Sequence, residues 1–210
     1  MKLFNQCYVD ESIYDTLGVV VTAFIFSNSD FEPLVTSALM EAGIDTPREE
    51  YKSSARMDTD HRMRDARDML LRLAGSKANI AVFFGPFDRP RLGRQALQAV
   101  QSVLLRNAID TSALSLYFDQ EIFPSQGEAE RLHSVFHYLA DCRIHAVEDS
   151  RIRVGIQVAD AVAHSFGQII KAALTGKAKT IDISGPDTGY TCLLYTSPSP
   201  RDHLAHLVCR

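Results

Sequence analysis

The stretch KLFNQCYVDESIYDTLGVVVTAFIF, residues 2–26, decides the fold. Its two ends, residues 2–10 and 18–26, are rich in the β-branched and aromatic side chains that favour strands. Because the two segments follow one another closely, we expect them to pair as an antiparallel hairpin. This hairpin is predicted to begin the sheet around which the rest of the chain folds.

Helices and strands alternate after the hairpin. Apolar residues at spacings of three and four predict helices over 31–42, 62–74, 91–106 and 154–174. Ser125 is the expected N-cap of a further helix over 125–140, with Glu128 completing a capping box. Buried strands are expected over 78–84, 112–119 and 143–147. The order predicts an α/β fold, a mixed sheet flanked by helices, in a single domain over residues 1–190.

The composition is that of an ordinary globular protein. Of 210 residues, 46% are hydrophobic and 23% charged, which excludes collagen, coiled coil and a wholly disordered chain. No apolar run approaches the roughly 18 residues of a membrane-spanning helix, and Asp10 and Glu11 interrupt the N-terminus before a signal-length apolar region develops. We therefore expect a cytoplasmic protein with no membrane partner. The net charge of −4 argues against a uniformly basic surface but leaves room for a local basic groove.

The last residues differ in character from the rest. Residues 192–202, CLLYTSPSPRD, and 206–210, HLVCR, resemble the translation of a transposase sequencing adapter and the constant segment that follows its index. We therefore expect residues 191–210 to be an artefactual tail that does not fold, the alternative being a genuine disordered tail. The four cysteines, Cys7, Cys142, Cys192 and Cys209, lack close metal-ligand spacing and are expected to be reduced.

Three acidic residues occupy apolar surroundings: Asp10 at the end of the first predicted strand, Asp119 at the end of a central strand, and Asp160 in the last helix. An unpaired buried carboxylate costs several kcal/mol or takes up a proton. Divalent cations would satisfy clustered carboxylates, and hard oxygen ligands select Mg²⁺ or Mn²⁺. Such a cluster suits phosphodiester chemistry.

Local geometry leaves alternatives open for these residues. On a helical wheel, Gln157, Asp160 and His164 lie together just beyond the apolar arc, which also fits an ordinary solvated face. Asp10 equally fits a turn former. Because side chains alternate along a strand, Asp10 and Glu11 point to opposite sides, so only one of them is expected at a site.

Four motifs together resemble a known family. They are CYVDES (residues 7–12), EEYKSS (49–54), the pair Phe118 and Asp119, and DSRIRVGIQVADAVAH (149–164). In this order and spacing they are similar to the bacterial and phage family called domain of unknown function (DUF) 3800. The resemblance covers nearly all of residues 1–175 and implies a ribonuclease H-like fold.

The resemblance also implies roles for individual residues. Asp10, Asp119 and Asp160 would be the first-strand, central-strand and final-helix carboxylates that bind the metal ions. Glu50 and Lys52 match an E-x-K element, and Glu11 and Gln157 accompany the main motifs, while Ile13 replaces the glycine usual in the family. The implied activity is that of a metal-dependent nuclease hydrolysing RNA or DNA through two metal ions. The expected catalytic residues are Asp10, Glu11, Lys52, Asp119 and Asp160.

The sequence leaves several roles open. Lys52 either neutralises charge on a phosphate or pairs with Glu50 or Glu49. His164 is either a proton shuttle or a surface residue. Three groups of arginines are candidates for a phosphate track, although Arg64 is equally placed to pair with Asp68: Arg62, Arg64 and Arg67; Arg89, Arg91 and Arg94; Arg151 and Arg153.

A second class of function remains: a catalytically inactive ribonuclease H-like module that binds nucleic acid or a protein. Carboxylate geometry separates the two classes. Convergence of Asp10, Asp119 and Asp160 favours the enzyme, whereas divergence, or pairing with arginines, favours the binding module.

Overall fold

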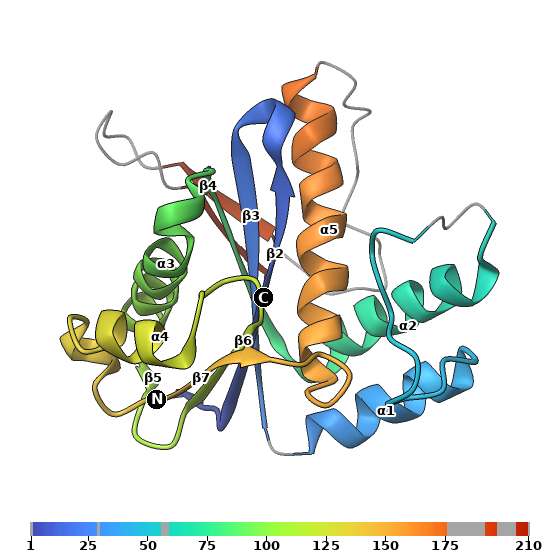
Figure 1. The fold of residues 1–210 in the computed structure, drawn as a ribbon, viewed down its shortest axis with the longest axis horizontal. Coiled ribbons are helices and arrows are strands. Elements are labelled where there is room, and N and C mark those ends of the chain that lie inside the picture. Colours follow the sequence, from blue (N-terminus) through green and yellow to red (C-terminus); the bar gives the residue numbers. More distant parts are fainter. Residues whose placement is uncertain (1, 29, 56–58, 176–191, 197–204, 210) are drawn as a thin grey trace.

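A mixed sheet forms the centre of the molecule (Figure 1). The computed structural model describes residues 2–28, 30–55, 59–175, 192–196 and 205–209. Within them, β2 (Gln6–Tyr14), β3 (Val19–Ser27) and β4 (Asn79–Pro86) run antiparallel, while β6 (Ser115–Asp119) and β7 (Arg143–Glu148) continue the sheet parallel to β2. The central strand order is β7-β6-β2-β3-β4. A separate short pair joins β1 (Lys2–Leu3) to β5 (Ile109–Asp110).

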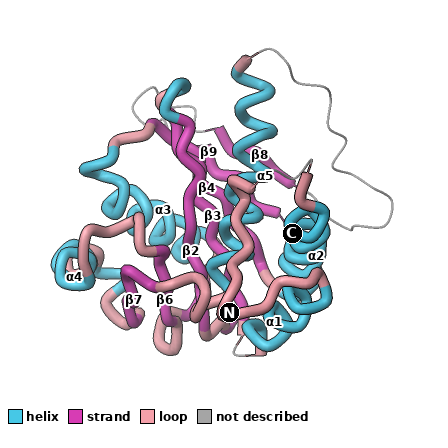
Figure 2. The backbone as a smooth tube through the Cα atoms, turned by 45° about the vertical axis from the view of Figure 1, so that its right-hand side comes forward, coloured by secondary structure: helices cyan, strands magenta, loops and turns pink. Residues whose placement is uncertain are grey.

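Helices cover both faces of the sheet (Figure 2). One face carries α1 (Phe31–Glu41), α2 (His61–Lys77) and α5 (Gly155–Leu174). The other carries α3 (Leu92–Arg106) and α4 (Gln126–His133). Short 3₁₀ turns occur at Asp15–Leu17, Arg89–Arg91 and His137–Leu139. The predicted α/β class, a mixed sheet flanked by helices in one domain, is confirmed.

The alternation of side chains along the strands produces two apolar cores. On β2, Cys7 and Val9 pack toward α3, whereas Tyr8 packs toward α5, and all three are fully buried. The sheet is therefore covered on both faces, which explains why the strands read as nearly continuous apolar runs. The carboxylates that interrupt these runs stand out against that background.

The predicted hairpin is confirmed, but its turn lies further along the chain. β2 continues to Tyr14, Asp10 pairs with Ala23, and the turn is formed by residues 15–17 and by Gly18, which has a φ of +62°. The expectation that Asp10 ends the first strand is therefore wrong, and Asp10 is not a turn former. The polar run after Val9 stays extended because β3 offers it a full length of backbone partners.

Two helix boundaries also differ from expectation. The second helix runs through Gly75 to Lys77, and α4 ends at His133, where residues up to 140 were expected. Ser125 is the N-cap, accepting a hydrogen bond from the Glu128 backbone N–H at 3.2 Å. The carboxylate of Glu128 binds Arg131 on the helix surface, which takes it away from the capping box.

The C-terminal residues were expected not to fold. In the structure β8 (Cys192–Thr196) and β9 (Ala205–Cys209) form a hairpin, and β9 pairs with β4. An edge strand offers unpaired backbone groups to any segment that can extend beside it, so this pairing does not depend on where the segment comes from. The origin of the tail in an adapter remains a prediction.

The described helices include none that is both long enough and apolar enough to span a bilayer.

The start of α5 approaches the sheet too closely for a side chain. A Cβ at Gly155 would lie 2.5 Å from the ring of Tyr8, which is fully buried. Gly155→Ala should therefore lower the free energy of unfolding by about 1–3 kcal/mol, despite the better helix propensity of alanine. Urea denaturation measures this. The matched control is Gly127→Ala in α4, where the added methyl meets nothing within 4 Å and stability should hold or rise. Equal effects of the two substitutions would contradict the packing argument.

Candidate functional site: a carboxylate pocket

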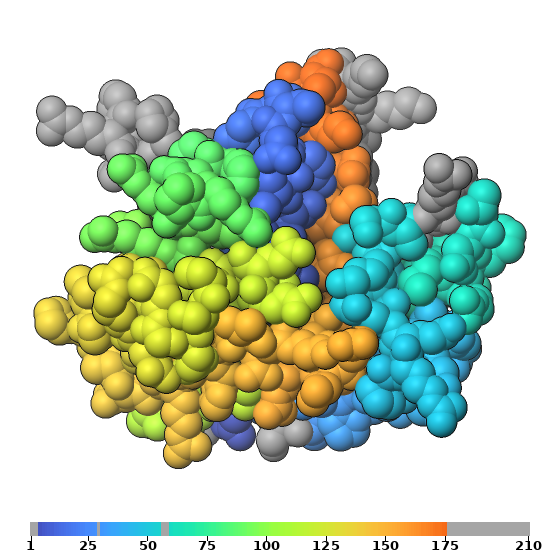
Figure 3. Space-filling model, in the orientation of Figure 1, coloured from blue at the N-terminus to red at the C-terminus, as the bar shows by residue number. Residues whose placement is uncertain are grey.

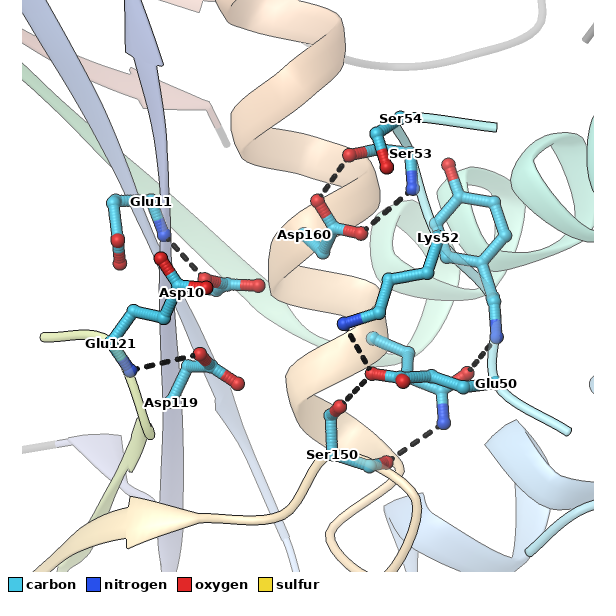
Figure 4. A pocket seen from close by; sticks show the side chains of 12 residues that line it. Asp10, Glu11, Glu50, Lys52, Ser53, Ser54, Asp119, Glu121, Ser150 and Asp160 are labelled. Atoms are coloured by element: carbon cyan, nitrogen blue, oxygen red, sulfur yellow. Dashed lines mark hydrogen bonds and ion pairs between the residues drawn. The ribbon is translucent and has the colours of Figure 1, made fainter. Parts of the chain in front are cut away.

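An open pocket of ≈ 140 Å³ lies where β2, the end of β6, α5 and residues 50–54 meet (Figure 3). Six of the twelve residues that line it are acidic and one, Lys52, is basic. Figure 4 shows two sides: Asp10, Glu11, Asp119 and Glu121 on the sheet, facing Glu50, Lys52, Ser53, Ser150 and Asp160 on and around α5. Tyr51, Ser54 and Gln157 complete the lining. The pocket is strongly acidic.

The three acids singled out from the sequence reach this one pocket from three elements. Val9 pairs with Phe118 on the parallel strand β6, so the next residues, Asp10 and Asp119, leave adjacent strands on the same face. That face is the one covered by α5, which carries Asp160. The convergence therefore follows from strand register and from the packing of α5 on the sheet.

Each of these carboxylates is held by a backbone N–H. Asp10 Oδ1 accepts from the Glu11 amide at 2.7 Å, and Asp119 Oδ2 accepts from the Glu121 amide at 3.2 Å. Asp160 Oδ2 accepts from the Ser53 amide at 2.9 Å, and its Oδ1 accepts from the Ser53 hydroxyl. These bonds orient the carboxylates and leave further lone pairs available, since each carboxylate can accept about four hydrogen bonds.

Burial and mutual repulsion disfavour the ionised forms of these acids. Burial raises the pKa of Asp10 well above its usual range, and the charges of Asp160, Glu11 and Asp119 raise it further. Burial also raises the pKa values of Asp119 and Asp160, against the hydrogen bonds that favour their charged forms. The pocket would gain from any positive charge placed between the carboxylates.

Glu11 lines the pocket together with Asp10, where strand alternation led us to expect only one of the two. The reason is that β6 pairs with β2 only as far as Val9, whereas β2 continues to Tyr14. Beside Glu11 the sheet is therefore open, and its long side chain reaches the pocket around the strand end. Burial, then the charges of Asp119 and Glu121, raises the pKa of Glu11 to about 8. Its Oε2 is buried with no hydrogen-bond partner in the described structure.

Lys52 pairs with Glu50 and lines the carboxylate pocket as well. Its Nζ lies 2.8 Å from Glu50 Oε1, and Glu50 also accepts a hydrogen bond from the Ser150 hydroxyl. Burial alone would lower the pKa of Lys52, but Glu50 and the charges of Asp119 and Asp160 raise it above its ordinary value. Lys52 therefore stays protonated. Glu49, the other partner considered, pairs with Arg62 at 3.1 Å.

Gln157 ties two loops to α5. Its Oε1 accepts from the Tyr51 amide at 2.8 Å, and its Nε2 donates to the Ser150 carbonyl at 2.8 Å. The side chain is 1% exposed, so both hydrogen bonds are formed out of water. The helical wheel placed Gln157 beside Asp160 on the edge of the apolar arc. In the structure its side-chain amide holds both loops that flank the pocket.

The structure does not bring His164 into the pocket lining. Its Nε2 lies 3.2 Å from Gln168 Nε2, one turn further along α5. Most of the candidate phosphate-track arginines pair with neighbouring acids. Arg64 lies near Asp65 and His61, where Asp68 was the expected partner, and Asp68 pairs with Arg67. The other pairs are Arg62 with Glu49, Arg89 with Glu121, Arg91 with Asp88, Arg151 with Asp149, and Arg153 with Glu32 and Glu148.

Five pocket residues had no role in the sequence reasoning: Tyr51, Ser53, Ser54, Glu121 and Ser150. Ser53 and Ser150 lie inside motifs that were quoted for other residues, and they lie in irregular segments without a period from which a facing direction could be read. Glu121 follows Asp119 by two residues, a spacing that would have identified it had the strand end been treated as a site edge.

The donor set suits hard divalent cations. Carboxylate oxygens from Asp10, Asp119, Asp160 and Glu11 are ligands that Mg²⁺ and Mn²⁺ prefer. As the side chains stand, no group of three or more His, Cys, Asp or Glu in the described part of the chain is arranged to hold a metal ion. The carboxylates line one pocket from opposite sides, where they would supply oxygen ligands to a bound cation. The unpartnered Glu11 Oε2 fits such a role.

Comparison with known proteins supplies no relative: no family model matches the chain, and no curated protein matches its sequence. The resemblance to DUF 3800 thus rests on the four motifs alone, and each of the four supplies at least one residue to the pocket.

The raised pKa of Glu11 gives the metal-free protein a defined pH dependence. Folded, Glu11 keeps its proton up to about pH 8, whereas its ordinary pKa of 4.5 applies when the chain unfolds. Between these values the folded state binds more protons, so stability falls as pH rises. Glu11→Gln should lose less stability than the parent between about pH 5 and pH 8. Melting curves in chelator measure this. The exposed Glu41→Gln should keep the parent's slope, and an unchanged slope in Glu11→Gln would refute the assignment.

Proposed function

We propose that the chain is a metal-dependent nuclease of ribonuclease H-like fold, hydrolysing phosphodiester bonds of RNA or DNA by a two-metal carboxylate mechanism. One observation carries the proposal: Asp10, Asp119 and Asp160, far apart in sequence, line one pocket. This is the arrangement that favours an enzyme over an inactive binding module. Within the described residues, no ion pair joins any of the three to an arginine.

The sheet supports the fold part of the proposal. β2 pairs antiparallel with β3 and parallel with β6. It carries Asp10, while β6 carries Asp119 and the last described helix carries Asp160, which are the three positions that the family resemblance implies for the carboxylates. The pocket also lies at the carboxyl end of parallel β6, where sites of open α/β sheets commonly form.

The chain's own residues divide the work. Asp10, Asp119 and Asp160 would hold Mg²⁺ or Mn²⁺, with Glu11 beside them. When bound, such cations activate a water as the nucleophile and stabilise the leaving oxygen. The protein keeps these carboxylates oriented through the amides of Glu11, Glu121 and Ser53.

Lys52 is the residue best placed to contact a phosphate oxygen. It stays protonated and its side chain is 54% exposed, so donors not used by Glu50 face solvent at the pocket. A positive charge fixed near a phosphate stabilises the negative charge that develops during hydrolysis. Glu50 and Ser150 then serve to direct the lysine across the pocket mouth.

Cleavage of labelled RNA, DNA and hybrid substrates by the full chain with Mn²⁺ tests the proposal. Asp10→Asn, Asp119→Asn and Asp160→Asn should each abolish turnover, as should a chelator, because each carboxylate is required to bind the cations. Melting curves should show that the variants stay folded, since each removes repulsion from the pocket. Cleavage that survives both chelator and Asp160→Asn would remove this mechanism. Binding without cleavage would support the inactive module.

A separate substitution tests the role of Lys52. Lys52→Gln keeps a polar side chain but removes the charge, and should lower the cleavage rate roughly 10²–10³-fold, the usual cost of losing one donor to a developing negative charge. Lys77→Gln, at the exposed end of α2, is the matched control and should cleave at the parent rate. A Lys52→Gln rate equal to that of the parent would assign Lys52 to the ion pair with Glu50 alone.

A further inference from the structure

Residues 50–53 cross α5 as an extended strap that is held by side chains. The Tyr51 amide donates a hydrogen bond to the side chain of Gln157, and the Ser53 amide donates one to the carboxylate of Asp160. The Ser150 hydroxyl donates a hydrogen bond to the carboxylate of Glu50. The alternate amides of the strap thus point at α5, while Glu50 and Lys52 lie at the pocket. Figure 4 shows Asp160 directed at Ser53 from the helix.

Ser53 is distinguished within the strap because it binds Asp160 twice. Its amide reaches Oδ2 at 2.9 Å and its hydroxyl reaches Oδ1, so both carboxylate oxygens are fixed by one residue. These two hydrogen bonds lower the pKa of Asp160 against the stronger effect of burial, which raises it. Two donors on two oxygens also fix the plane of the carboxylate.

We infer that Ser53 is the positioning residue of the cation site: its hydroxyl and amide hold the Asp160 carboxylate in one orientation at the carboxylate pocket, where Asp160 would bind a divalent cation. The inference rests on the proposed function, which used only the backbone amide of Ser53. It adds the side-chain hydroxyl, to which neither the motifs nor the proposed mechanism gave a role. Ser53 acts through Asp160 and contacts neither cation nor substrate.

The physical basis is the support that metal-binding carboxylates receive from their own hydrogen-bond donors. Loss of such a donor typically weakens metal affinity by roughly 10–100-fold, because the ligand must then be ordered when the metal binds. The strap is suited to this role since its own position is fixed by buried Gln157, 1% exposed, one turn before Asp160 on the same helix. The donor, Ser53, and the acceptor, Asp160, are therefore both held in place by α5.

Isothermal titration of the full chain with Mn²⁺ alone tests the inference without any nuclease assay. Ser53→Ala keeps the hydrogen bond from the backbone amide to Asp160 but loses the one from the hydroxyl, and should weaken Mn²⁺ binding roughly 10–100-fold. Ser53→Thr restores a hydroxyl on the same Cβ and should bind within a few-fold of the parent. The control Ser76→Ala removes an exposed hydroxyl on α2 and should bind as the parent does.

The outcomes separate the inference from the proposed function. If the parent chain fails to bind Mn²⁺, the proposed function falls and the inference falls with it. If the parent binds and Ser53→Ala binds equally well or more tightly, the inference is overturned while the proposed function stands. Melting curves check that Ser53→Ala is folded. Should it be unfolded, Ser53→Thr decides: a folded threonine variant with lost affinity overturns the inference, and retained affinity supports it.

Discussion

The site depends on one electrostatic constraint: several carboxylates are buried together at the point where β6 stops and β2 continues. Like charges in a poorly hydrated pocket repel strongly, and burial removes the water that would screen them. Three of the acids, Asp10, Asp119 and Asp160, each accept a hydrogen bond from a backbone N–H, and Lys52 faces them across the pocket. These contacts reduce the repulsion among the carboxylates.

The two apolar cores hold the acids in place. Sheet and α5 pack through fully buried residues such as Tyr8 and Val158, and Gly155 brings the helix close to the strand. Rigid strands and a rigid helix fix the Cα positions of Asp10, Asp119 and Asp160 more firmly than loops would. The clustered carboxylates therefore lower the stability of the folded state, and the packing of the two apolar cores compensates for that loss. A stability cost at the site is common where a function requires it.

Sequence patterns predicted the layers and the three acids well, because period and apolar content report directly on burial. They misjudged Asp10 because the local run of Asp10, Glu11 and Ser12 reads as a turn, whereas long-range pairing with β3 keeps it extended. They also expected only one of Asp10 and Glu11 at the site, because side chains alternate along a strand, but β6 ends before Glu11 and both residues line the pocket. Strand register and strand length depend on pairing with segments distant in the sequence, so a short stretch of sequence does not reveal them.

The residues that sequence reasoning missed lie in irregular segments, outside the helices and strands. The site therefore has one part on regular elements and one part on irregular segments. Asp10, Asp119 and Asp160 come from regular elements, where apolar neighbours make a carboxylate conspicuous. Ser53 and Ser150 come from irregular segments, and as hydrogen-bond donors they need only reach an acceptor, which an irregular backbone can adjust to. The three predicted carboxylates are therefore placed by the rigid framework, whereas irregular segments supply hydrogen bonds to the site. Ser53 and Ser150 belong to the site only through the carboxylates that they bind. Predicting them from the sequence therefore requires knowing first where those carboxylates lie.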